Sequence, residues 1–179
     1  MEIENLLGWY SKLKGMRFAS LRYFNAAGYD IDGEINGLEK EPNNLIPIVL
    51  ETIMGKREEV VVFGSDYDTA DGSCIRDYIH VNDLAEAHLS ALGYLESQNQ
   101  DLVVNLGTSK GLSVLEILRI AREVSGAEFK YTLGPRRAGD PAVVLAEASL
   151  AEELLDWVPK HSDAATLLET SLRAYRKST

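Results

Sequence analysis

The chain has 179 residues with a formal net charge of −10 at pH 7, and 45% of its residues are hydrophobic. A chain of this size folds as one domain with a real core, and its acidity argues against general nucleic-acid binding, which relies on a basic face. No apolar run is as long as the roughly twenty residues that a membrane-spanning helix needs. The acidic first residues do not resemble a secretory signal. The single cysteine, Cys74, excludes an internal disulfide and fits a cytoplasmic location.

The predicted elements alternate between helices and short strands. Apolar spacing and flanking caps predict helices over residues 3–13, 45–54, 83–95, 114–125, 149–157 and 163–176. Runs of β-branched and aromatic residues predict strands over residues 17–24, 60–63, 75–81, 102–106 and 129–133, with a further extended segment at 142–146. A long loop is expected between Asn25 and Asn44. This alternation, with no repeat and no clear boundary, predicts one α/β domain over residues 1–179.

Three of these helices are expected to begin with a capping box, in which a side chain caps the helix and a Glu three residues later bonds back. The pairs with this spacing are Asp83 with Glu86, Ser113 with Glu116, and Ser149 with Glu152. Gly126 is expected to close the second of these helices, since glycine readily adopts the left-handed conformation of a helix end.

Arginines are the candidate anion-binding residues. Arg76 stands at the start of the extended segment 75–81, where an arginine is costly to keep without an anionic partner. Arg136 and Arg137 lie in a Gly/Pro-rich loop with Asp140. Two arginines in such a loop can clamp a phosphate, with the aspartate orienting a guanidinium or a sugar hydroxyl. The alternative for this loop is a surface ion pair, which contributes little.

Other polar residues have weaker assignments. Asn25 follows a strand end, where open α/β sheets bind ligands, but the residues alone favour a turn. Asn43 and Asn44 precede a helix, and capping is the favoured role there. Tyr10 and Lys14 have the Tyr-x-x-x-Lys spacing of a catalytic pair. Tyr10 also falls on the apolar stripe of its helix, which favours a packing role.

The sequence predicts neither a metal site nor a cysteine nucleophile. His80 and His88 lack a third ligand at a suitable spacing, and His88 fits an exposed helix turn. Cys74 has no base partner nearby, so a buried thiol is expected.

Five segments resemble the UDP-glucose (UDP-galactose) 4-epimerase family of the extended short-chain dehydrogenase/reductase superfamily. They are Leu-Arg-Tyr-Phe-Asn-Ala-Ala-Gly (21–28), Pro-Asn-Asn-Leu-Ile-Pro (42–47), the long segment 62–85 that contains Cys-Ile-Arg-Asp-Tyr-Ile-His-Val-Asn-Asp, Asn-Leu-Gly (105–107) and Pro-Arg-Arg-Ala-Gly-Asp-Pro-Ala (135–142). They occur in family order and cover nearly the whole chain. The resemblance implies the carboxy-terminal, substrate-binding part of an extended Rossmann-type epimerase.

The resemblance also implies the sites. Asn25, Asn44 and Leu45 would contact the UDP-sugar. Val61 and Phe63 would pack against its uracil.

The charged residues have implied roles as well. Arg76 and Arg137 would bind the diphosphate, and Asp140 would lie on the uridine ribose or beside the two arginines. Tyr23 would lie near the nicotinamide of NAD, which is the cofactor of the full-length family enzymes.

The departures from the family pattern concern the catalyst. The family begins with a Gly-x-x-Gly-x-x-Gly dinucleotide-binding half, and no such motif occurs in these 179 residues. The match places the catalytic lysine just upstream of Met1, and Tyr10 with Lys14 is too close to Tyr23 to be the catalytic pair. No catalytic residue is therefore assigned, and the first βαβ unit is expected to be missing.

The resulting expectation is the UDP-sugar-binding portion of an enzyme that interconverts UDP-galactose and UDP-glucose through a 4-keto intermediate. It is expected to be inactive and not to bind NAD alone. The alternatives are a non-catalytic nucleotide-sugar-binding module, or one half of a split enzyme that assembles with a separate NAD-binding chain. Without that half the chain should expose apolar surface, and self-association is expected to cover it.

Overall fold

The computed structural model describes residues 2–35 and 37–178. The helices in these ranges are α1 Glu2–Lys14, α2 Leu45–Ile53, α3 Val81–Gln98, α4 Val114–Ser125, α5 Ser149–Leu155 and α6 Ala164–Lys177. The strands are β1 Ala19–Arg22, β2 Asn25–Ala27, β3 Glu59–Phe63, β4 Ile75–Arg76, β5 Tyr78–His80, β6 Leu102–Asn105, β7 Leu112–Ser113, β8 Lys130–Gly134 and β9 Val143–Val144. Within the described ranges, no helix is long and apolar enough to span a membrane.

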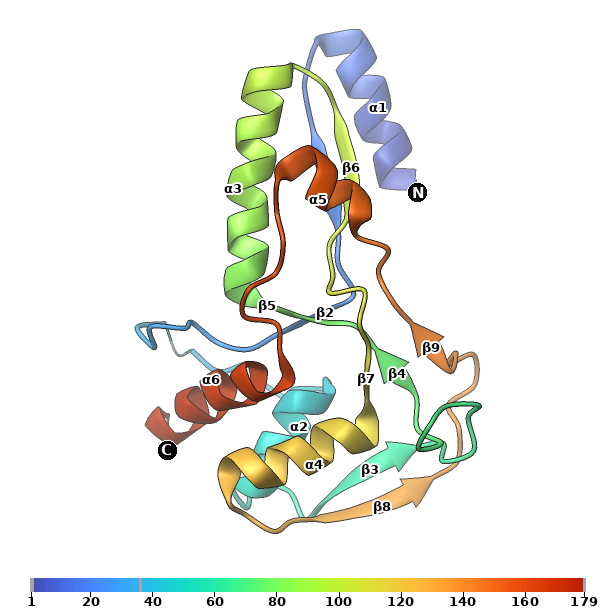
Figure 1. The fold of residues 1–179 in the computed structure, drawn as a ribbon, viewed down its shortest axis with the longest axis vertical. Helices are drawn as coiled ribbons and strands as arrows, with labels where there is room; N and C mark the ends of the chain where they lie inside the picture. The colour runs from blue at the N-terminus through green and yellow to red at the C-terminus, as the bar shows by residue number, and fades with distance from the viewer. Residues whose placement is uncertain (1, 36, 179) are drawn as a thin grey trace.

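The strands pair mostly in parallel. β1 pairs with β6, β2 with β5 and β3 with β8, each in parallel, whereas β4 lies between an antiparallel β7 and a parallel β9. Parallel neighbours need long crossover connections, and helices supply them here (Figure 1). The predicted α/β class is confirmed.

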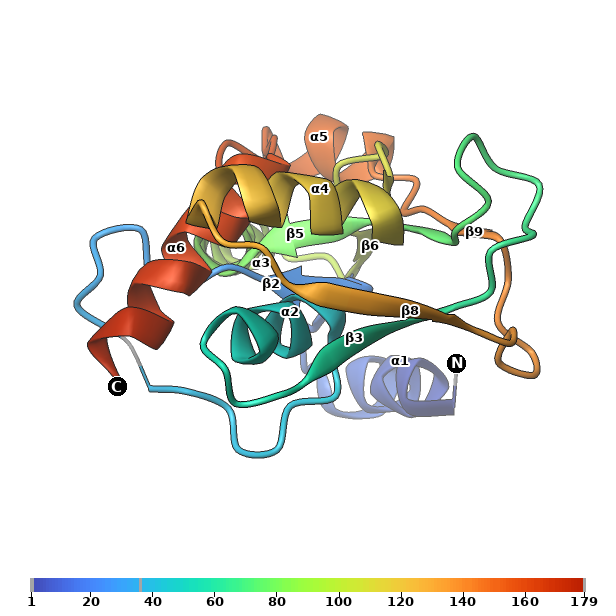
Figure 2. The same cartoon turned by 90° about the horizontal axis from the view of Figure 1, so that it is seen from below.

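The buried side chains form two apolar clusters. One lies among β1, β6, α3 and α5, and the other lies among β3, α2, α4 and α6 (Figures 1 and 2). In β3 the side chains alternate, so that Val60 and Val62 are buried in the second cluster while Val61 is exposed on the opposite face. That alternation leaves one face of β3 free to line a site.

Most boundaries shift by a few residues from the sequence prediction, and two differences affect the site. Asn25–Ala27 was expected to open a loop, but it forms β2 by pairing with Tyr78–His80. Asn and Ala favour strands weakly, and this pairing is between residues distant in sequence, so the local pattern gives no signal of it. The extended segment 75–81 is interrupted at Asp77, and its last residue, Val81, is already the first residue of α3.

The helix caps test one half of each predicted capping box, the side chain that caps the helix. Ser113 accepts a hydrogen bond from the backbone N–H of Glu116 at 3.0 Å, and Gly126 ends α4 in the left-handed conformation, as predicted. The other two boxes are wrong. The ring of His80 caps α3, so Asp83 lies inside the first turn. Ser149 is the first residue of α5 rather than its cap.

Both the backbone conformation and the surrounding side chains require a glycine at position 28. Its φ is +79°, and a Cβ there would lie 2.3 Å from the ring of His80. We expect Gly28→Ala to destabilise the fold by about 2 kcal/mol or more, because strain and overpacking add. Gly93→Ala is the control, since Gly93 lies inside α3 with open space around its Cβ position. In urea denaturation, Gly93→Ala should leave the free energy of unfolding unchanged or raise it. An equal loss of unfolding free energy in both variants would contradict the steric argument.

His80 is fully buried and neutral. Its Nδ1 accepts from the backbone N–H of Asn82 at 3.1 Å, so the proton is on Nε2, which donates to Thr170 Oγ1 at 3.1 Å. That hydroxyl in turn donates to the carbonyl of Thr166 at 2.8 Å. Protonation of Nδ1 would therefore break the cap of α3.

This arrangement predicts loss of stability in mild acid. Burial lowers the pKa of His80 below its ordinary value of 6.5. As the pH falls, His80 is therefore protonated in the unfolded chain before it is protonated in the folded chain. The contribution of neutral His80 to the free energy of unfolding is complete above pH 6.5 and is lost as the pH falls below that value. The free energy of unfolding should fall less steeply in His80→Gln than in wild type across this range. His88→Gln, on an exposed turn of α3, should follow wild type, and a wild-type slope in His80→Gln would contradict the assignment.

Candidate functional site

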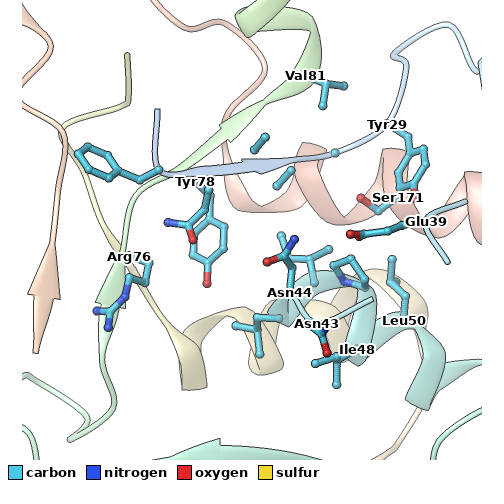
Figure 3. Close-up of a pocket in the computed structure, with 18 of the residues that line it drawn as sticks. Tyr29, Glu39, Asn43, Asn44, Ile48, Leu50, Arg76, Tyr78, Val81 and Ser171 are labelled. Atoms are coloured by element: carbon cyan, nitrogen blue, oxygen red, sulfur yellow. The ribbon is translucent and has the colours of Figure 1, made fainter. Parts of the chain in front are cut away.

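A cavity of about 1170 Å³ opens where β2 and β5 approach α2 and β3 (Figure 3). Its wall is assembled from segments far apart in the sequence. The structure brings together on this wall every residue to which the family resemblance gives a binding role: Tyr23, Asn25, Asn44, Leu45, Val61, Phe63, Arg76, Arg137 and Asp140.

The cations of the cavity are Arg76 and Arg137. The guanidinium of Arg76 is mostly buried, pairs with the carboxylate of Asp140 and donates to the carbonyl of Ile75 at 2.7 Å. The guanidinium of Arg137 lies 4.0 Å from the centre of the Phe63 ring, and it forms no ion pair within residues 2–35 and 37–178. Its charge is therefore available to an anion in the cavity.

Arg136 does not join this pair. Its Nε donates to Asp66 at 2.7 Å, and its guanidinium lies over the ring of Tyr67 at 4.2 Å. This hydrogen bond raises the pKa of Arg136 and lowers that of Asp66. The predicted pairing of Arg136 with Arg137 is therefore wrong: Arg136 forms the surface ion pair that was its alternative, and Arg76, from a distant strand, lines the cavity with Arg137 instead.

The two asparagines present amide groups to the cavity. Asn25 donates from Nδ2 to the carbonyl of Asp77 at 2.8 Å, which fixes its side chain on β2. Asn44 occupies the cap position of α2 but makes no side-chain capping bond. Its exposed amide points into the open space between Tyr78 and Glu39 (Figure 3). The capping role that the residues alone favoured for Asn44 is thus not seen.

Apolar and aromatic side chains complete the wall. Val61 faces the cavity because it alternates with buried neighbours on β3, and Phe63 lies two residues further along the same face. Leu45 is half-buried at the start of α2. Tyr23, just beyond β1, lines the cavity with nearly half of its surface exposed. This wall can accept a flat ring beside a charged group.

Tyr78 was missed by the sequence reasoning. It is buried, and its hydroxyl points into the cavity near Arg76 (Figure 3). Burial raises its pKa, so the hydroxyl is neutral and available as a donor. The signal was present, because residues two apart on an extended chain share a face and Arg76 was already a candidate.

Asp77 holds this segment in place from the opposite face. Its buried carboxylate accepts from the backbone N–H of Thr108 at 2.9 Å, of Ser109 at 3.1 Å and of Ala146 at 3.1 Å. These bonds tie two loops to the strand that carries Arg76.

The surroundings of Cys74 and His88 agree with the sequence analysis. Cys74 lines the cavity but is buried, as predicted, and burial raises the pKa of its thiol. His88 is exposed on α3, as expected. Across residues 2–35 and 37–178, no three His, Cys, Asp or Glu side chains are grouped to hold a metal ion.

Comparison with known proteins identifies the family. Residues 1–107 match the model of the NAD dependent epimerase/dehydratase family. The UDP-glucose 4-epimerase of Halalkalibacterium halodurans is 44% identical over 169 residues, which are 94% of this chain and 51% of that protein. The chain thus spans about half the length of the curated relatives it matches.

Solved structures show the same likeness. The UDP-glucose 4-epimerase of Stenotrophomonas maltophila, with bound NAD and formylated UDP-arabinopyranose, superposes with a TM-score of 0.94 at 38% identity, over 99% of this chain and 53% of that one. The enzyme of Bifidobacterium longum, in complex with NAD+ and UDP, gives a TM-score of 0.87 at 35% identity, over 98% of this chain and 52% of that one. The α/β, Rossmann-like fold of these epimerases is therefore shared, and the chain belongs to the NAD dependent epimerase/dehydratase family.

Proposed function

We propose that this chain is the carboxy-terminal, UDP-sugar-binding portion of a UDP-glucose 4-epimerase and that it does not epimerise UDP-sugars alone. The observation that carries the proposal is the cavity, where two arginines from distant segments converge beside an apolar wall. Arginine suits a diphosphate because its planar fork makes paired, charge-assisted hydrogen bonds. The relatives that contain UDP or a UDP-sugar support the same ligand class.

Within this proposal the arginines grip the diphosphate. Arg76 and Arg137 bind its oxygens, and Asp140 orients Arg76 or accepts from the ribose hydroxyls. The hydroxyl of Tyr78, which is neutral at ordinary pH, donates to the same end of the ligand.

The apolar wall and the amides receive the rest of the ligand. Val61 and Phe63 pack against the uracil. Asn25, Asn44 and Leu45 contact the UDP-sugar from β2 and the start of α2. A firm grip on UDP combined with a loose grip on the hexose suits a reaction in which the sugar must turn over in the site.

NAD fits this chain poorly. In the epimerases NAD supplies the hydride acceptor and donor for C4, and its binding needs a glycine-rich turn before a helix. These 179 residues contain no Gly-x-x-Gly-x-x-Gly, and the contribution we propose for them is Tyr23, exposed beside the cavity. The NAD-binding half and the catalytic Tyr-x-x-x-Lys pair would belong to another segment or another chain.

A turnover assay tests the claim of inactivity. The purified chain is incubated with UDP-galactose and NAD, and UDP-glucose is measured by chromatography. We expect no product above the protein-free control, because these 179 residues contain no glycine-rich dinucleotide motif, and Tyr10 and Lys14 do not line the cavity. Formation of UDP-glucose would contradict this part of the proposal.

The alternatives are a non-catalytic module that binds nucleotide sugars and one half of a split enzyme. Calorimetry with UDP separates them in part. Micromolar binding by the chain alone supports a preformed site, as a module requires. Absence of binding indicates a site that is completed by the NAD-binding half. The observed convergence of the arginines favours the preformed site.

A further inference from the structure

Arg136 is held outside the cavity by the loop that follows β3. Its Nε donates to Asp66 Oδ1 at 2.7 Å, and its Nη2 donates to the backbone carbonyl of the same residue. Its guanidinium also lies 4.2 Å from the centre of the Tyr67 ring. None of these three residues lines the cavity. Two hydrogen bonds and a ring contact, here called the Arg136 anchor, hold a guanidinium in one orientation more firmly than a single ion pair does.

The Arg136 anchor is closely packed. Gly64 comes directly after Phe63 with a φ of +80°, and a Cβ there would collide with the Tyr67 ring and lie 2.9 Å from Cγ of Arg136. The N–H of Gly64 donates to the carbonyl of Gly134, the last residue of β8, at 2.9 Å. The loop after β3 and the loop after β8 therefore leave their strands side by side.

The residues next to Arg136 in the chain face the cavity. Arg137 lines it, and the guanidinium of Arg137 lies 4.0 Å from the centre of the Phe63 ring. The backbone N–H of Asp140 donates to the carbonyl of Arg137 at 3.2 Å, which closes a turn over residues 137–140. The hydroxyl of Tyr67 donates to the carbonyl of Asp140 at 3.4 Å. The turn is therefore connected to the loop after β3 at both of its ends, by Arg136 before it and by Asp140 within it.

The exposure of the Arg136 anchor distinguishes an orienting role from a stabilising one. The side chains of Arg136 and Asp66 are 46% and 74% exposed, and an exposed ion pair adds little to the stability of a fold. Arg137 has no ion pair in residues 2–35 and 37–178 to fix its direction. Loss of the anchor should therefore alter where Arg137 points more than it alters the stability of the chain.

We propose that Arg136 is a positioning residue for the diphosphate. Fixed to Asp66 and Tyr67, it holds the turn 137–140 so that Arg137 and Asp140 face the bound ligand. The inference rests on the proposed UDP-sugar site and adds to it a residue that does not line the cavity. Charge-assisted hydrogen bonds weaken steeply when donor and acceptor are misaligned, so a displaced turn should lower the affinity for the diphosphate.

Removal of the Arg136 side chain is the first test. In calorimetric titrations, Arg136→Ala should bind UDP about tenfold more weakly than wild type, with a urea midpoint close to that of wild type. Arg119→Ala is the matched control, because Arg119 is also exposed and paired with an acid, Glu123, and does not line the cavity. It should bind UDP like wild type. Unchanged affinity in Arg136→Ala, or an equal loss in both variants, would overturn the proposal.

Substitution of Asp66 separates positioning from simple attraction between charges. Asp66→Ala removes an acceptor of the anchor and should weaken UDP binding about threefold. Asp66→Asn keeps an Oδ1 acceptor and should bind at least as tightly as wild type. Asp68→Ala is the control for charge, because Asp68 is an exposed carboxylate of the same loop with no ion pair among the described residues. It should not weaken binding. If charge alone mattered, loss of either carboxylate would strengthen binding of an anion, so tighter binding by Asp66→Ala would contradict the positioning role.

The direction of Arg137 can also be measured without a ligand. The Phe63 ring, 4.0 Å away, is expected to shift the NMR signal of the Arg137 Nε–H upfield in wild type. This shift should be lost in Arg136→Ala and kept in Arg119→Ala. If wild type does not bind UDP, the proposed function fails, while this measurement still decides the positioning role. An Arg137 signal that is the same in wild type and Arg136→Ala would refute that role.

Discussion

Arg76→Ala should weaken UDP binding by about thirtyfold or more, measured by isothermal titration calorimetry. The guanidinium is mostly buried beside Asp140 at the cavity wall. Its removal takes away charge-assisted hydrogen bonds to the diphosphate and leaves the carboxylate of Asp140 facing the phosphates. Loss of one partner of such a charged pair costs about 2 kcal/mol or more, which corresponds to this factor.

Two variants control this result. Arg76→Lys keeps the charge but not the planar fork, so its affinity should lie between wild type and Arg76→Ala. Arg119→Ala removes an exposed arginine that pairs with Glu123 on α4 and does not line the cavity. It should bind UDP like wild type. If Arg119→Ala weakens binding as much as Arg76→Ala, the effect is general electrostatics and the assignment to Arg76 fails.

Asp83→Ala should lower the free energy of unfolding by about 3 kcal/mol or more. Asp83 is fully buried, and its carboxylate accepts from the backbone N–H groups of Lys160 and His161 and from Ser162 Oγ at 2.5 Å. Alanine would leave these donors unsatisfied, at about 1–3 kcal/mol for each buried group. The network connects the first turn of α3 to the segment between α5 and α6, so its loss weakens the packing of both.

Urea denaturation measures this loss, and Asp163→Ala is its control. Asp163 caps α6 by accepting from the backbone N–H of Thr166 at 3.0 Å, but it is exposed. Its replacement should cost about 1 kcal/mol, as is usual for a helix cap. A loss in Asp83→Ala no larger than this would show that the buried carboxylate is not the anchor that the hydrogen bonds indicate.

The sequence predicts the regular elements well where the signal is local. The periodicity of residues 114–125 and the flanking Ser113 and Gly126 fix α4 to the residue. The short strand Asn25–Ala27 forms because it pairs with β5, and the strand preferences of its own residues do not predict it. The capping box at Asp83 fails for a similar reason, because His80 takes the cap and distant backbone groups take the carboxylate.

The candidate site was predictable to a comparable degree. Arg76 stood out because an arginine in an extended apolar segment needs a partner, and the structure gives it Asp140. Residue composition could not distinguish Arg136 from Arg137, since the backbone path decides which of the two faces the cavity. The sequence likewise does not predict that the apolar side of α1 faces outward. The periodicity of a helix shows that one side is apolar but not in which direction that side points.

The central claim is that the cavity recognises the diphosphate of a uridine nucleotide. Parallel calorimetric titrations of the wild-type chain with UDP and with uridine test it most directly. We expect saturable one-to-one binding of UDP, and binding of uridine weaker by about a hundredfold, since two arginines bind a group that uridine lacks. Equal affinity for UDP and uridine, or no binding of UDP in a folded chain, would contradict the account.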